Sequence, residues 1–203
     1  MNLLSFLRRP PPIATPQALA EFIDGNAAFV VQKGLYEYSR ARAGHYAKVL
    51  FAEKTFQDAI EKSRWRAYPL GLAMVAELTE GFLRPAAADR QAQFEAISAL
   101  ALLAFDHYPV PAALGAPTWS ALRLDLENNL KRINMHAPKR AMDVPEPFLE
   151  KYFDLIPIHE KLRSAEFPTI SNYLRVTMCN IHAELEKRAD VQRLVPQLTG
   201  GPT

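Results

Sequence analysis

The distribution of proline places the strongest constraint on the fold of this chain. The sequence contains 16 prolines, yet none lies between Pro16 and Pro69. Within that interval, a row of positions recurs at alternating steps of four and three residues, the spacing that keeps one side of an α-helix facing a partner. The row consists of Val31, Leu35, Tyr38, Arg42, His45, Val49, Ala52, Phe56, Ala59 and Ser63. This spacing predicts one long helix over about residues 27–67.

Further segments, separated by proline or glycine, also show helical periodicity. Leu70–Leu83 is apolar on nearly every face, which predicts a buried helix, and we expect it to form a buried central pair with Pro85–Tyr108. Thr118–Asn134, Phe148–Ile156 and residues 168–188 predict further helices, and no segment shows the alternation of a strand. The sequence therefore predicts an all-α, single-domain bundle of six or seven helices.

Capping and breaking residues predict where the helices begin and end. Thr15 is a predicted N-cap, with Pro16 at the first helical position. We expect Gly25–Asn26 to end this first short helix. Tyr68–Pro69 is expected to end the long helix, because a residue before proline disfavours helical angles. The row of apolar positions favours a continuous helix, and a break at Gly44 is the alternative.

The two ends of the sequence differ in composition from the rest. Residues 1–16 include three consecutive prolines and predict a flexible proline-rich segment. Residues 17–190 are expected to form the helical domain, and residues 191–203 a disordered tail. Met1–Arg9 places an apolar patch before two arginines, the reverse of a secretory signal. We expect Met1–Arg9 either to form a frayed terminus or to lie as an amphipathic segment on a membrane or on a partner.

Overall composition excludes several classes of protein. Apolar residues make up 49% and charged residues 23% of the chain, the balance of a globular protein. No stretch approaches the roughly 18 apolar residues of a membrane span. The single cysteine, Cys179, excludes an intrachain disulfide. These features predict a cytoplasmic protein, with peripheral membrane attachment through Met1–Arg9 as an alternative.

Arg42 and His45 form the leading candidate site because they interrupt an otherwise apolar row. A charge at a packing position costs on the order of several kcal/mol unless it is paired or hydrated. With Tyr38, one step earlier in the row, the two side chains are candidates to bind an anionic ligand. The alternative is a structural network in which Glu77 or Glu80 neutralises Arg42. The candidate ligand-binding residues are therefore Tyr38, Arg42, His45, Glu77 and Glu80.

A second candidate site lies on the last predicted helix. Arg175, Cys179, His182 and Glu186 fall on one stripe, and a thiol near cations can act as a nucleophile, with Cys179 and His182 as the reactive pair. The alternative is a solvated helix face that carries an incidental cysteine. Asp106–His107–Tyr108 is a third polar cluster, which can equally reflect the preference of histidine for a helix C-terminus.

The sequence lacks the commonest catalytic signatures. It contains no Glu-x-x-His, His-Glu-x-x-His or Cys-x-x-Cys motif, no glycine-rich phosphate loop and no Gly-x-Ser-x-Gly turn. We therefore expect neither a metal nor a cofactor. The missing motifs favour a protein that is not an enzyme, without excluding one.

Three function classes remain open from the sequence. The first is a non-enzymatic helical protein that binds a protein partner, a membrane-associated complex or a second copy of itself. The second is small-molecule binding or catalysis around Tyr38, Arg42 and His45. Nucleic-acid binding is the weakest, because the net charge is only +2. Its sequence support is the basic first third of the chain. Trp65 is expected to pack, and its place between two arginines offers a cation–π contact or a weak nucleic-acid platform as the alternative.

Overall fold

The computed structural model describes residues 10–157 and 163–200. The all-α prediction is confirmed over these residues, which contain helices and no strand. None of the helices in this part of the chain is both long and apolar enough to cross a membrane. Predictions for residues 1–9, 158–162 and 201–203 lie outside the described residues.

The first helix, α1, spans Pro16–Val31 and begins as predicted. The Thr15 side chain accepts a hydrogen bond from the backbone N–H of Ala18 at 3.2 Å. The predicted end at Gly25–Asn26 is wrong, because apolar side chains are buried along the same face on both sides of it. Burial of that face outweighs the roughly 1 kcal/mol by which a glycine weakens a helix.

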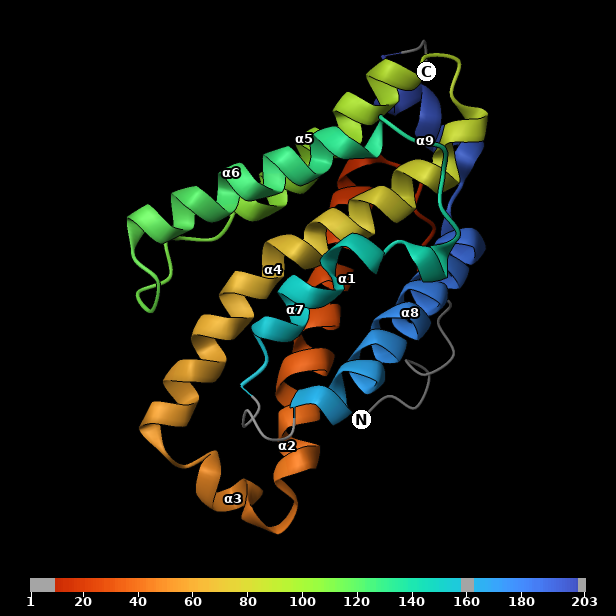
Figure 1. The fold of residues 1–203 in the computed structure, drawn as a ribbon. Coiled ribbons are helices and arrows are strands. Elements are labelled where there is room, and N and C mark those ends of the chain that lie inside the picture. The colour runs from red at the N-terminus through yellow and green to blue at the C-terminus, as the bar shows by residue number, and fades with distance from the viewer. Residues whose placement is uncertain (1–9, 158–162, 201–203) are drawn as a thin grey trace, which may run out of the picture.

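The long helix predicted over residues 27–67 is broken in the structure. A π-helix, Gln32–Glu37, follows α1 and leads into α2, Tyr38–Ala43. Gly44 ends α2 with a φ of 51°, a left-handed conformation that glycine adopts without the steric cost of a Cβ. A single turn and α3, Ala47–Leu50, then lead into the next helix, so that the chain reverses as a helical hairpin (Figure 1).

The positions of the row differ in burial along its length. Val31 and Leu35, before the break, are each 1% exposed, whereas Val49, after it, is 62% exposed. The spacing of the row is the same on both sides of the turn. Spacing alone therefore did not reveal which positions of the row are buried.

Helix α4 spans Lys54–Leu83 and continues through Pro69. The predicted end at Tyr68–Pro69 is therefore wrong, and the predicted helix Leu70–Leu83 is the C-terminal half of α4. A proline inside a helix costs about 3 kcal/mol. Pro69 and all residues from 70 to 80 are buried, so that packing offsets this cost.

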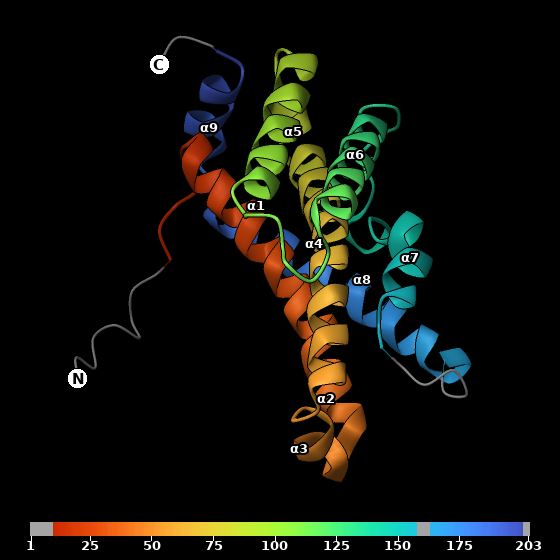
Figure 2. The same cartoon turned by 90° about the vertical axis from the view of Figure 1, so that its left-hand side faces the viewer.

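The remaining helices follow α4 in the chain, and α4 runs through the middle of the molecule (Figure 2). They are α5, Arg90–Asp106; α6, Ala116–Ile133; α7, Leu149–Asp154; α8, Arg163–Arg188; and α9, Val191–Leu198. Single 3-10 turns lie at Arg84–Ala86, Ala141–Asp143 and Glu146–Phe148. Helix α4 contacts α1, α5, α6 and α8.

Two of these helices differ in detail from the sequence prediction. In the predicted central pair, residues 70–80 are buried on all sides, whereas α5 buries one face and leaves Leu103 62% exposed. Helix α8 was expected to begin at Pro168, but it begins at Arg163 and includes this proline near its start. Pro168 is the sixth residue of this range, so it lies beyond the first turn and removes one hydrogen bond of the helix.

The two ends of the described chain are held against each other. The Ile13 N–H donates to the carbonyl of Arg188 at 2.9 Å, and the Ile13 carbonyl accepts from the N–H of Asp190 at 3.0 Å. Ile13 is fully buried, and so is Leu194 of α9. The structure thus differs from the predicted flexible segment (1–16) and disordered tail (191–203) at residues 10–16 and 191–200, because backbone pairing and burial fix both.

Helices α1 and α4 approach each other closely at Ala27 and Gly71. A Cβ atom added to Gly71 would lie 2.9 Å from the carbonyl oxygen of Ala27, closer than side chains pack against backbone. Ala27 itself is fully buried. The absence of a side chain at Gly71 therefore permits this crossing.

Two tyrosines hold the π-helix in place. The hydroxyls of Tyr152 and Tyr173 donate hydrogen bonds to the carbonyl of Val30 at 2.8 and 3.2 Å. Burial raises the pKa of Tyr173 to about 12 and the pKa of Tyr152 well above its usual value, so both hydroxyls keep their protons at neutral pH. Irregular helical turns arise where outside groups insert into the backbone ladder. Gly34 lies beneath these side chains, and a Cβ there would overlap the Tyr152 hydroxyl and lie 2.8 Å from the Tyr173 ring.

We predict that Gly34→Ala lowers the free energy of unfolding by about 2 kcal/mol, because the new methyl group displaces the two tyrosines. The matched control is Gly25→Ala, at an exposed position of α1, where an added Cβ meets nothing within 4 Å. That control should raise stability by up to about 1 kcal/mol. Urea unfolding followed by far-ultraviolet circular dichroism measures both, and equal effects would contradict the role assigned to Gly34.

Candidate functional site

Glu166 of α8 engages two of the predicted ligand-binding side chains. The Tyr38 hydroxyl donates a hydrogen bond to one carboxylate oxygen, and Arg42 forms an ion pair with the other. The Glu166 side chain is 7% exposed, whereas that of Arg42 is 52% exposed. The arrangement is a network in which a buried carboxylate is neutralised by a cation at the surface.

His45 is not part of this network. It lies in the 3-10 turn Gly44–Tyr46 and is exposed, because the break at Gly44 separates it from α2. Glu166, which sequence reasoning missed, lies 128 residues from Tyr38. No spacing rule within one helix reports such a contact.

The acids that were expected to neutralise Arg42 pair with other cations. Glu80, which is buried, accepts hydrogen bonds from Arg84 Nε at 2.8 Å and from Arg84 Nη2 at 2.6 Å. Glu77 forms an ion pair with Lys139, with 2.7 Å between Nζ and Oε1. The five predicted ligand-binding residues therefore lie in three separate places.

The side chains of the predicted thiol stripe on α8 also point to separate partners. Cys179 is a free, exposed thiol. The ring of His182 packs edge-on against Phe82, with 5.6 Å between centroids. Arg175 pairs with Glu146. No hydrogen bond joins Cys179 to His182, both of which are described, and the reactive pair stays a prediction.

An aromatic cluster surrounds Asp24 where α1, α4 and the end of α5 meet. The Tyr68 hydroxyl donates to Asp24 Oδ1 at 2.5 Å, and the Tyr108 hydroxyl donates to the same atom at 3.1 Å. Burial, reinforced by Asp24, raises the pKa of both tyrosines, so that both remain protonated donors. The Trp65 ring lies edge-on to both, with centroids 6.1 and 5.4 Å away.

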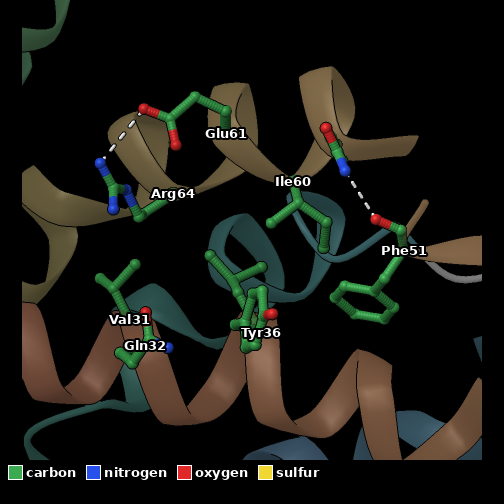
Figure 3. Close-up of a pocket in the computed structure, with 9 residues that line it drawn as sticks. Val31, Gln32, Tyr36, Phe51, Ile60, Glu61 and Arg64 are labelled. Carbon is green, nitrogen blue, oxygen red and sulfur yellow. Dashed lines mark hydrogen bonds and ion pairs between the residues drawn. The ribbon is translucent and has the colours of Figure 1, made fainter. Parts of the chain in front are cut away.

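Beside this cluster, two adjoining cavities form a groove. Their volumes are about 300 Å³ and 380 Å³, and Figure 3 shows the first of them. Both are lined by Val31, Gln32 and Arg64, so they adjoin at these side chains. One wall consists of residues between Gly25 and Tyr36, and the other includes α4 residues between 57 and 68. We name this feature the α1–α4 groove; at the rise of an α-helix it is about 17 Å long.

The α1–α4 groove has an apolar floor and a polar rim. Val31, Leu35 and Ile60 are at most 7% exposed, whereas Gln32 and Arg64 are exposed. In Figure 3, Val31 and Ile60 point from opposite helices into the space between them. An apolar centre surrounded by polar groups is the usual anatomy of a protein interface.

Arg64 lies where the two cavities meet, and its neighbours fix its position. Its Nη2 donates to Glu61 Oε1 at 3.1 Å, and Trp65 Nε1 donates to the same oxygen at 2.6 Å. The guanidinium lies over the Trp65 ring, with Cζ 4.8 Å from the centroid. The cation–π contact that the sequence offered as an alternative for Trp65 is thus present with Arg64. Sequence reasoning otherwise missed the groove, because residues such as Val31 and Ile60 are typical of a closed core.

Comparison with protein-family models, curated proteins and solved structures gives no significant match for this chain. The site is therefore interpreted from its geometry. Among residues 10–157 and 163–200, no group of three His, Cys, Asp or Glu side chains has the arrangement needed to hold a metal ion.

We predict that Arg42→Met lowers the free energy of unfolding by about 1 kcal/mol, because it leaves the buried Glu166 carboxylate without its cation. The effect is modest because Arg42 is half exposed. The control, Arg40→Met, changes an exposed residue of the same helix and should alter stability by less than about 0.5 kcal/mol. Chemical denaturation of both variants is the measurement; indistinguishable midpoints would show that Glu166 does not depend on Arg42.

Proposed function

We propose that this protein is a non-enzymatic binding protein that holds a helical segment of a protein partner in the α1–α4 groove. The observation that carries this proposal is an open groove of about 17 Å, or about three helical turns, with an apolar floor and a polar rim. Amphipathic helices bind other proteins by laying their apolar face into grooves of this kind. The partner is a second protein or a second copy of this chain.

Small-molecule binding around Tyr38, Arg42 and His45 has less support. Glu166 already engages Tyr38 and Arg42, and His45 lies apart from them. Membrane attachment through Met1–Arg9 concerns residues outside the described ranges. A cytoplasmic location remains part of the proposal, and its support is the single free thiol, Cys179.

Site-specific photo-crosslinking tests the proposed function. Benzoylphenylalanine at Gln32, which lines both cavities, is expected to yield a discrete crosslinked partner in cells that naturally carry this protein. The same probe at Leu124, which is 56% exposed on α6, should yield none, because it lies outside the groove. Equal crosslinking at the two positions would contradict the proposal.

Two exposed apolar residues, one in the groove and one outside it, provide a test variant and its matched control. Phe29 lines the groove and is 46% exposed, so Phe29→Glu should abolish the crosslink at Gln32 without changing the melting temperature. Leu103 is 62% exposed on α5, and Leu103→Glu should leave the crosslink intact. A crosslink that survives Phe29→Glu would mean that the partner binds elsewhere.

A further inference from the structure

We infer that the helix bound in the α1–α4 groove is acidic, with a carboxylate side chain held by Arg64 and apolar side chains in the cavities on either side. This inference rests on the proposed function and specifies the chemistry of the partner. Its basis is the position of Arg64, which lines both cavities at the point where they join.

The guanidinium of Arg64 is oriented before any partner arrives. It lies over the face of Trp65, and its Nη2 is bonded to Glu61. Figure 3 shows the other terminal nitrogen turned away from Glu61 and toward Val31, on the groove side. Within the described residues, Arg64 makes no further side-chain hydrogen bond. This nitrogen is therefore left for a ligand, and hydrogen bonds from a guanidinium to a carboxylate are strengthened by the opposite charges.

The Glu61 carboxylate does not occupy the groove side of the Arg64 guanidinium. Its Oε1 atom already accepts from both Trp65 Nε1 and Arg64 Nη2. These two bonds hold the Glu61 carboxylate on the side of the guanidinium that faces away from Val31 (Figure 3). Glu61 thus fixes the orientation of Arg64 and leaves its groove edge to an incoming acid.

The charge of the surrounding walls favours an acidic partner as well. Residues 25–36 and 57–68, which form the two walls, carry four basic and two acidic side chains, of which Arg64 and Glu61 line the cavities. A net positive surface attracts an acidic segment and raises the rate of encounter. Charge complementarity therefore agrees with the position of Arg64.

The two cavities also set the spacing of the partner's apolar side chains. Helix α4 lines the first cavity from Gln57 to Arg64 and the second from Arg64 to Tyr68. The centres of these stretches differ by about five residues, or about 8 Å. A helix that fills both cavities thus presents two apolar side chains one to two turns apart, with the acid between them.

Fluorescence anisotropy with two synthetic peptides tests this inference. The first is a fluorescein-labelled, alanine-based helical peptide with two leucines about two turns apart and a glutamate midway. The second carries glutamine in place of that glutamate. We expect the glutamate peptide to bind the full chain about tenfold more tightly. Arg64→Gln should abolish this preference, whereas Arg66→Gln, an exposed neighbour outside the groove, should retain it.

The outcomes separate this inference from the proposed function. Equal affinity of the two peptides for the wild-type chain would overturn the acidic-partner inference and leave the groove as a helix-binding site. If neither peptide binds and no crosslink forms at Gln32, both are wrong. Displacement of the glutamate peptide by dodecanoate at lower concentration than by unlabelled peptide would assign the carboxylate to a fatty acid and also overturn the inference.

Discussion

The contact between α1 and α4 at Ala27 and Gly71 organises the rest of the described fold. The C-terminal half of α4 is buried there among α1, α5, α6 and α8. Toward Gly44, the two arms of the hairpin lie apart and are joined by α3 (Figure 1). The same two helices thus pack closely at their crossing and lie apart at the groove. Side chains at a helix crossing set the distance between the axes, so the groove depends on a glycine that does not line it.

The sequence predicts features that depend on neighbours along the chain, and misses those that depend on distant segments. Thr15 begins α1 as predicted, because capping is local. Pro69 sits inside α4 because tertiary burial offsets its cost, which periodicity does not show. The turn at Gly44 interrupts a row whose spacing is unchanged across it. The pairing of Arg42 with Glu166 joins two helices far apart in sequence.

The residues that line the groove are largely not the candidate site residues of the sequence. Unusual polar residues such as Arg42 and Glu80 form ion pairs that neutralise buried charges. The floor of the groove consists of ordinary buried residues such as Val31 and Ile60, and only its rim is exposed. The amino-acid composition does not show where a groove opens between helices. The nearest sequence signal was Trp65 with its flanking arginines.

The most direct test of the crossing is a comparison of Gly71→Ala with Gly81→Ala, two glycine substitutions in α4. A Cβ at Gly81 would meet Pro138 at an ordinary 3.4 Å, whereas one at Gly71 would lie 2.9 Å from the backbone of Ala27. We predict that Gly71→Ala lowers the free energy of unfolding by about 3 kcal/mol and that Gly81→Ala leaves it unchanged or raises it by up to about 1 kcal/mol. Equal free energies of unfolding for the two variants would contradict the claim that this close approach sustains the fold.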